Sequence, residues 1–508
     1  MPTATSWTDP LRDLRHLVRF RLAQSRRPAR LRLMVGVLVV LTLAAMVVPA
    51  YLPGAADYEH GRAFDLLLLL PSGYAGFLGL ATVSAVASGG GRELVPREEA
   101  VAWPIGPATD HAGALLMAPL NIAWLLQGWL LLGATAYVVG PGTLPLAQPI
   151  ALLWLAFGTA LAQLLAWTME AIRRGRYGVV LTRSLMALVG LAMAGAVVSG
   201  RLTGVLDELP TVRLVTVIAA ATTGLSWSWV VAVVVLLLLT VVVAGLGVLP
   251  ARVALRRPAR DEQRLETGHY PPRRHPRSEL LAMVRVDRAS VWRAVSLRRG
   301  VILLAAAPGL VALSGDLEWE LLTVLPGLVA SGAALLFGVN AWCLDGRGGL
   351  WRDSLPVAPG AVFAARVWVL LELLLASSAA TLVLAGLRAG RPSAAEIAAL
   401  LCCWLVVALQ VVSLSMRWSV RQPFAVDLRS ARATPAPPMV MVGYSGRLAL
   451  STTVTGLVFS GVAQLADWQV ALLVTVPFLS VAGIRLLRAR DAWVDPVVRS
   501  RVVATVAA

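Results

Sequence analysis

The stretch LPVAP, residues 355–359, stands directly before a long apolar run, and WPIGP, residues 103–107, stands before another. Their first prolines, Pro104 and Pro356, are 252 positions apart, about half of the 508 residues. Proline has no N–H to donate and disfavours the α conformation in the residue before it. Two prolines three positions apart therefore predict the end of one helix, a stiff turn and the start of the next. Because the pattern occurs twice, we interpret it as a rigid lever between apolar helices. The simpler alternative is that the prolines only separate one helix from the next.

Composition indicates a membrane protein. Hydrophobic residues make up 58% of the chain, charged residues only 14%, and the mean hydropathy is +0.74. Soluble domains have about 25% charged residues. The net charge is +17, and every basic residue is an arginine. These arginines stand beside apolar runs, which is the pattern of the cytoplasmic ends of membrane spans and not that of a nucleic-acid-binding patch.

The apolar runs predict an all-α, polytopic membrane protein with about twelve transmembrane helices. A helix needs about 20 apolar residues to span a bilayer. Runs of about this length lie at residues 33–52, 66–88, 112–137, 150–170, 180–199, 228–249, 300–315, 321–343, 364–386, 395–416, 446–466 and 469–487. With both termini in the cytoplasm, five arginines fall in outer loops and the other forty on the inner side or at inner span ends. This asymmetry is typical of a multi-pass protein, here expected in the plasma membrane.

Five segments follow from this pattern. Residues 1–32 contain an arginine-rich stretch, Arg12–Arg30, in which leucines recur at helical spacing; it predicts a cytoplasmic amphipathic helix in the membrane interface. Two six-span domains are expected at 33–249 and 300–490. A basic cytoplasmic linker with a second interfacial helix separates them at 250–299, and 491–508 form a cytoplasmic tail.

The two halves share more than the proline pattern. Gln163 and Met169 correspond to Gln410 and Met416, both at an offset of 247. The order of features is the same in both halves, and six spans is an even number, so the repeats are expected to be parallel and related by an axis along the membrane normal. The first half also has an apolar stretch at 214–225 that is too short to cross, which we interpret as an outer re-entrant or interfacial helix.

Motifs of catalysis and metal binding are missing from the sequence. Without lysine the chain has no phosphate loop of the GxxxxGK[ST] type, and it contains neither HExxH nor GxSxG. The five histidines are scattered, and the three cysteines have no metal-ligand spacing. We therefore expect neither an enzyme nor a metal site.

Few polar residues lie inside the apolar runs. The candidates for a substrate path are Glu372, Gln163, Gln410, Asn121 and Gln127. Glu372 is the only acid deep in a run, nine residues after Phe363, which is about 13 Å along a helix and near the bilayer midplane. An acid at that depth is either a substrate or proton site or a paired contact between helices. For the two glutamines at matching positions, helix packing is the alternative role.

The basic amphipathic N-terminal helix, the six spans and the LPVAP turn before the third span resemble the permease subunits of type-two ABC exporters, and WPIGP is a weaker form of that turn. Residues 280–299 open the second half as the N-terminal helix opens the first. The stretch at 214–225 is similar to the re-entrant helix that this family carries between spans five and six, and the second half lacks it. The resemblance covers the layout of both halves.

This resemblance implies two permease domains fused in one chain, which export a hydrophobic or amphipathic substrate. They would work with two copies of a separate cytoplasmic ABC ATPase that binds ATP and magnesium, so no cofactor is expected on this chain. The inner loops at 89–111 and 345–363 would be the coupling elements that dock on the ATPases. The coupling residues implied are Trp103, Pro104, Pro107, Arg97, Leu355, Pro356, Pro359 and Arg352.

Two alternatives remain at the level of sequence. An ion-coupled secondary transporter with two six-helix halves is one, because Asp345-Gly-Arg-Gly resembles the loop after the second span in the major facilitator family; the first-half copy lacks the aspartate. Proton-driven transport by the chain alone, abolished by Glu372→Gln, would favour it. A membrane enzyme or assembly factor is the other, and the missing nucleophile and metal motifs disfavour it.

Overall fold

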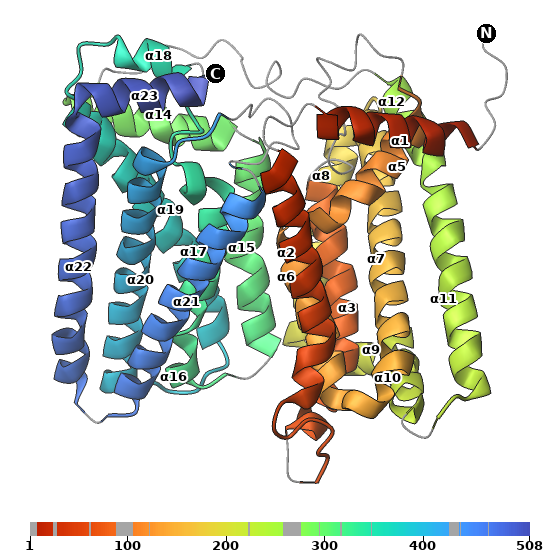
Figure 1. The fold of residues 1–508 in the computed structure, drawn as a ribbon. Coiled ribbons are helices and arrows are strands. Elements are labelled where there is room, and N and C mark those ends of the chain that lie inside the picture. The colour runs from red at the N-terminus through yellow and green to blue at the C-terminus, as the bar shows by residue number, and fades with distance from the viewer. Residues whose placement is uncertain are drawn as a thin grey trace. The chain divides into compact units, whose positions relative to one another are not determined.

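The structure is a computed structural model that describes residues 8–23, 28–59, 62–87, 105–120, 122–221, 224–257, 276–293, 295–314, 317–346, 348–425, 436, 438–465 and 467–507. Over this part the protein is all-α, as the sequence predicts, with no strand in the described ranges (Figure 1). The chain divides into two compact units, one made of Met1–Met193 with Arg201–Arg260 and the other of Ala194–Gly200 with Asp261–Ala508.

The first unit begins with an amphipathic helix. In α1 (Thr8–Ala23), Leu14 and Leu17 are half-buried while Arg12 and Arg15 are exposed, which confirms the expected amphipathic pattern. The helix differs from the expected Arg12–Arg30 at both ends: it begins at Thr8, and Pro28–Arg30 belong to the next helix, whose first turn suits a proline. The helices that follow are α2 (Pro28–Val47), α3 (Ala63–Ala87), α5 (Pro107–Met117), α6 (Ile122–Val139), α7 (Leu144–Arg173), α8 (Gly178–Val198), α9 (Leu202–Asp207), α10 (Pro210–Ala220), α11 (Trp227–Leu246) and α12 (Val248–Arg256).

Helices α3, α6, α7, α10 and α11 supply the core of this unit. Tyr74 of α3 hydrogen-bonds Thr135 of α6 at 3.0 Å, and the indole N–H of Trp154 in α7 donates to the Tyr74 carbonyl at 3.0 Å. Helix α10 contains most of the apolar stretch at 214–225 and buries Leu214 and Ile218 in this core. Burial against α3 explains why a stretch too short to cross a bilayer is still apolar.

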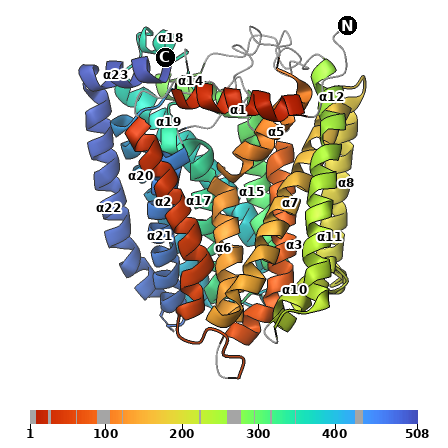
Figure 2. The same ribbon diagram turned by 45° about the vertical axis from the view of Figure 1, so that its right-hand side comes forward.

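The second unit begins with another partly apolar, arginine-bearing helix, α14 (Glu279–Arg293). The helices after it are α15 (Val295–Ser314), α16 (Trp319–Leu322), α17 (Leu325–Phe337), α18 (Gly348–Asp353), α19 (Pro359–Gly386), α20 (Ala394–Arg421), α21 (Pro438–Ala463), α22 (Trp468–Val494) and α23 (Pro496–Ala507). Helices α20 and α22 pack along each other, and both views show them side by side (Figures 1 and 2).

Six helices of the described ranges are long and apolar enough to cross a membrane, as expected of a membrane protein. They are Ala63–Val86, Pro141–Arg173, Trp227–Arg256, Pro359–Gly386, Ala394–Arg421 and Trp468–Val494. Large apolar side chains on them are exposed, for example Leu238 and Leu473, which is the property of helices that face lipid rather than water.

Two of the twelve expected runs are broken well inside their bounds. The run at 112–137 is divided between α5 and α6 by a 3-10 turn at Ala118–Leu120, whose Pro119 cannot donate to a preceding turn. The run at 321–343 is divided into α16, the short helix α17 and a 3-10 turn at Gly338–Asn340. An apolar run does not reveal such breaks, because hydropathy measures burial in lipid and not backbone hydrogen bonding.

Candidate functional site

The LPVAP turn connects α18 to α19, and its conformation is as the sequence predicts. Helix α18 ends at Asp353, and Pro359 occupies the first turn of α19, where its missing N–H costs no hydrogen bond. Between them the N–H of Leu355 donates to Arg352 and that of Val357 donates to Leu355. The turn is therefore short, hydrogen-bonded and limited in flexibility by two prolines.

A fully buried ion pair fixes the start of α19. The guanidinium of Arg366, two turns beyond Pro359, donates from Nε to Oδ2 of Asp287 at 2.9 Å and from Nη2 to Oδ1 at 3.0 Å. Asp287 comes from α14, and both side chains are 0% exposed. Such a two-point contact fixes orientation as well as distance. The pair therefore fixes α14 against the helix that follows the turn.

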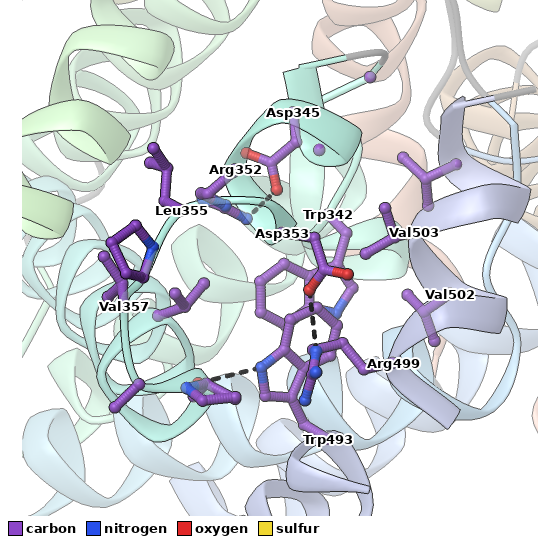
Figure 3. A pocket seen from close by; sticks show the side chains of 17 residues that line it. Trp342, Asp345, Arg352, Asp353, Leu355, Val357, Trp493, Arg499, Val502 and Val503 are labelled. Carbon is purple, nitrogen blue, oxygen red and sulfur yellow. Dashed lines mark hydrogen bonds and ion pairs between the residues drawn. The ribbon is translucent and has the colours of Figure 1, made fainter. Parts of the chain in front are cut away.

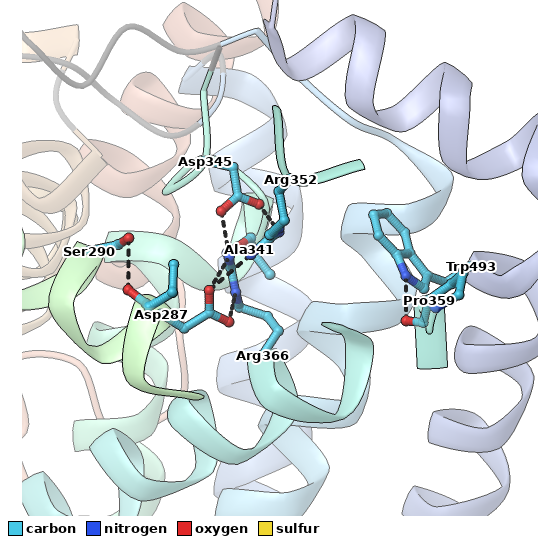
Figure 4. A network of polar contacts seen from close by, with 9 residues as sticks. Asp287, Ser290, Ala341, Asp345, Arg352, Pro359, Arg366 and Trp493 are labelled. Atoms are coloured by element: carbon cyan, nitrogen blue, oxygen red, sulfur yellow. Dashed lines mark hydrogen bonds and ion pairs between the residues drawn. The ribbon is translucent and has the colours of Figure 1, made fainter. Parts of the chain in front are cut away.

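Two further residues extend this pair to a closed ring of alternating charge (Figure 4). Asp345, in the loop before α18, accepts from Arg366 Nη2 at 2.8 Å and also from Arg352. Arg352 of α18 in turn donates to Oδ1 of Asp287 at 2.9 Å. Two arginines and two aspartates thus balance each other, and they join α14, α18, α19 and the loop before α18.

Burial of this ring is compensated by its internal pairing. Burial lowers the pKa of Arg352 from its usual value, and the nearby positive charge of Arg366 lowers it further, while the carboxylates of Asp345 and Asp287 oppose both effects. Arginine remains charged in proteins, so each guanidinium needs its carboxylates. Removing one member leaves a buried charge without its partner.

Two stacked indoles connect the ring to the C-terminal helices. Trp342 lies 5.1 Å from the Arg366 guanidinium and 5.6 Å from that of Arg352, measured from the ring centroid. Trp493, at the end of α22, stacks on Trp342 with centroids 3.8 Å apart and planes 8° apart. The Trp493 indole N–H donates to the carbonyl of Pro359 at 3.1 Å, so α22 contacts the turn directly.

A pocket of about 300 Å³ lies between the turn and the C-terminal helix α23 (Figure 3). Residues 355–359 form one wall, and Val502, Val503 and Val506 of α23 line the pocket as well. An ion pair between Arg499 and Asp353, at 2.8 Å, joins α23 to α18. The surface offered by the turn is thus partly apolar, with charges that are paired within the unit.

The structure brings together the second-half coupling residues that the sequence indicates. Leu355, Pro356, Pro359 and Arg352 all line the pocket. In the first half, Pro107 is at the start of α5 with Gly106 as its N-cap. The remaining first-half candidates, Arg97, Trp103 and Pro104, lie outside the described residues.

The candidates for a substrate path are dispersed. Glu372 is exposed and ion-paired to Arg288 of α14 at 2.7 Å, so it is a paired charge that joins α19 to α14. The side chain of Gln410 donates to Ser451 and accepts from Thr455 at 3.1 Å, which joins α20 to α21. Gln163 is buried in α7 and Gln127 half-buried in α6. Asn121 lies outside the described residues.

Sequence reasoning did not identify Asp287, Arg366, Trp342 and Trp493 as parts of this site. One signal was present, because an arginine inside an apolar run is costly and implies an acidic partner. The partner is 79 positions away in sequence, and six aspartates and glutamates compete for that role in residues 279–345. At the offset of 252 the first half has Ala114 in place of Arg366, so this ring is not repeated by sequence.

In the first half, helix α5, which begins at Pro107, is held by a histidine instead. The Nε2–H of His111 in α5 donates to the carbonyl of Ala244 in α11 at 2.9 Å. Gly247 makes room for the ring, because a Cβ at that position would lie 2.5 Å from it. Burial lowers the pKa of His111 below its ordinary 6.5, and the hydrogen bond to Ala244 opposes part of this effect.

We expect His111 to make stability depend on pH. The unfolded chain takes up a proton on this residue below its ordinary pKa of 6.5, whereas the folded protein resists protonation. The free energy of unfolding should therefore be constant above about pH 7.5 and decrease as the pH falls below about 6.5. Melting temperatures of the purified chain across this range would measure it. His111→Gln should flatten the slope and His16→Gln, at an exposed site, should leave it unchanged; equal slopes in all three proteins would contradict the assignment.

Comparison with models of known protein families, with curated proteins and with solved structures finds no match.

Proposed function

We propose that this chain is the membrane permease of an ATP-driven exporter, with two six-span domains fused in one polypeptide and a separate cytoplasmic ATPase bound in two copies. The observation that carries the proposal is the proline turn of residues 355–359, which is joined to α14, α18, α19, α22 and α23 by a buried ion ring, an indole stack and an ion pair. A turn fixed to this many elements transmits a displacement to them instead of absorbing it.

Twelve spans are proposed as six in each half. The helices assigned to them are α2, α3, α6, α7, α8 and α11 in the first half, and α15, α16 together with α17, α19, α20, α21 and α22 in the second. Each of these helices overlaps one of the expected apolar runs. In this arrangement the turns at 103–107 and 355–359 both precede the third span and lie on the cytoplasmic side, as coupling elements require.

The substrate is proposed to be hydrophobic or amphipathic. The described spans carry few charges, and the acid that a proton-coupled transporter would need, Glu372, is already paired with Arg288. An apolar path with amide and hydroxyl groups such as those around Gln410 suits a lipid-like or drug-like molecule better than an ion. The ion-coupled alternative is therefore less well supported than ATP-driven export.

The first test is biochemical. The full chain, purified from its native membrane in mild detergent, should carry an ATP-hydrolysing subunit, and native mass spectrometry should give two copies of it per chain. Transport is then measured as ATP-driven uptake of a lipophilic dye into inside-out vesicles. Reconstituted chain that transports the dye on a proton gradient without ATP would contradict the proposal.

The Pro356→Ala/Pro359→Ala variant tests the lever. We expect ATP hydrolysis by the complex to persist while dye transport falls about tenfold, because the loosened turn no longer passes the motion of the ATPase to α19; coupling between sites typically spans about 5–150-fold. Pro210→Ala is the matched control, since Pro210 also begins a helix but lies outside the turn. Equal transport by the double variant and the control would contradict the coupling role.

A further inference from the structure

Four arginines gather at the C-terminal ends of α20 and α22, outside the site described above. Arg417 and Arg421 are four residues apart on α20, and Arg485 and Arg488 are three residues apart on α22. Both spacings place the two side chains of a helix on one face, one turn apart. The helices pack along each other, and Arg417 lies close enough to the other three for their charges to interact.

No carboxylate of the described residues balances the positive charge of this cluster. Among the described residues none of the four arginines forms an ion pair with a carboxylate. The nearest acid along α22, Asp491, is one turn beyond Arg488 and forms no ion pair with it in the described helix. Neighbouring positive charges repel each other, so the arrangement favours binding of an anion that contacts several guanidinium groups.

The cluster also borders an apolar surface. Ile484 and Leu487 of α22 are 49% and 57% exposed, whereas Ala482 and Ala489 on the side that packs inward are buried. Arg488 follows one turn after Ile484 and directly after Leu487, so its charge lies at the border of the exposed apolar strip. An anion that fits here combines a negatively charged head with an apolar tail.

We propose that Arg417, Arg421, Arg485 and Arg488 form a binding site for the phosphate group of an acidic phospholipid, whose acyl chains lie along Ile484 and Leu487. Guanidinium groups bind phosphate oxygens in a two-point geometry that an ammonium group cannot reproduce. Basic sites between membrane helices on the cytoplasmic side have this chemistry. The inference does not depend on the proposed transport function, because it concerns lipid bound at the edge of the second unit.

Arginines at the inner ends of spans also serve simply to orient a chain in the membrane. The chain supplies a matched control for that role. Arg252 and Arg256 of α12 have the same four-residue spacing at the end of an apolar helix and are exposed. Two double variants therefore remove equal charge. The cluster variant is Arg417→Gln/Arg488→Gln, and the control variant, on a single helix, is Arg252→Gln/Arg256→Gln.

The experiment measures binding of phosphatidylglycerol to the delipidated full chain in neutral detergent, by native mass spectrometry and by the shift in melting temperature. Phosphatidylcholine tests the need for a net negative head group, and inorganic phosphate tests the need for the acyl chains. Each arginine near a lipid phosphate changes binding about fivefold, so the cluster variant should bind phosphatidylglycerol about 25-fold more weakly than the parent. The control variant should bind it within about twofold of the parent.

Three results would overturn the proposal. Equal losses in the two variants would mean that binding follows overall charge. Equal affinity for phosphatidylcholine would remove the role of the arginines, and an equal effect of inorganic phosphate would make the cluster a free-anion site. If the double variant does not fold, Arg488→Gln, at an exposed position, replaces it, with an expected loss of about fivefold; no loss would also overturn the proposal.

Discussion

Asp287→Asn is expected to lower the free energy of unfolding by about 3–5 kcal/mol, because it removes the carboxylate that binds Arg366 at two points and leaves a buried guanidinium without it. Asp345 would then be the only carboxylate of the ring for its two arginines, and the ring would carry a net positive charge inside the unit. The measurement is the unfolding midpoint of the purified chain in mild detergent, by denaturant titration followed by tryptophan fluorescence.

The adjacent residue provides the control. Arg288 is next to Asp287 on α14, but its side chain is 48% exposed and its partner Glu372 is 43% exposed. Exposed pairs contribute about 0–1 kcal/mol, so Arg288→Gln should have little effect. A second variant, Asp287→Leu/Arg366→Met, removes both charges and should recover much of the loss, because an apolar pair needs no counter-charge. Equal losses in Asp287→Asn and Arg288→Gln would contradict the ring as a stabilising element.

Trp493→Ala is expected to lower the free energy of unfolding by about 3–5 kcal/mol, the usual cost of truncating a buried tryptophan. The side chain is 3% exposed, stacks on Trp342 and hydrogen-bonds Pro359. Trp493→Phe keeps an aromatic ring but not the donor, and should cost about 1 kcal/mol for the hydrogen bond in addition to the smaller ring. The same unfolding titration measures both variants.

In the proposed exporter, the indole contact would also bear on coupling. If α22 restrains the turn through the Pro359 carbonyl, Trp493→Phe should reduce ATP-driven dye transport more than its modest loss of stability explains. Trp468, at the other end of α22, is 48% exposed, and Trp468→Ala is the control for changes to that helix. A Trp493→Ala variant as stable as Trp468→Ala would show that the stack does not hold the turn.

Several features of this protein were determined by the sequence alone. Pro359 and Pro107 each start a helix, because a ring-locked φ and a missing N–H suit only the first turn. The all-α class and the apolar helices follow from hydropathy, since a lipid-exposed backbone must bond to itself. The amphipathic pattern of α1 follows from leucines at helical spacing. Each of these properties depends on residues that are near one another in the chain.

The pairing of distant side chains was decided only by the tertiary structure. The sequence shows Arg366 in an apolar run, but only the packing of α14 on α19 brings Asp287 to it. The count from Phe363 placed Glu372 at mid-membrane, whereas the fold gives it Arg288 as a partner. The side chain of Gln410 likewise hydrogen-bonds residues of α21. Local patterns fix which segments are helical; which charges meet depends on how helices far apart in the sequence pack, because electrostatic partners are set by distance in space.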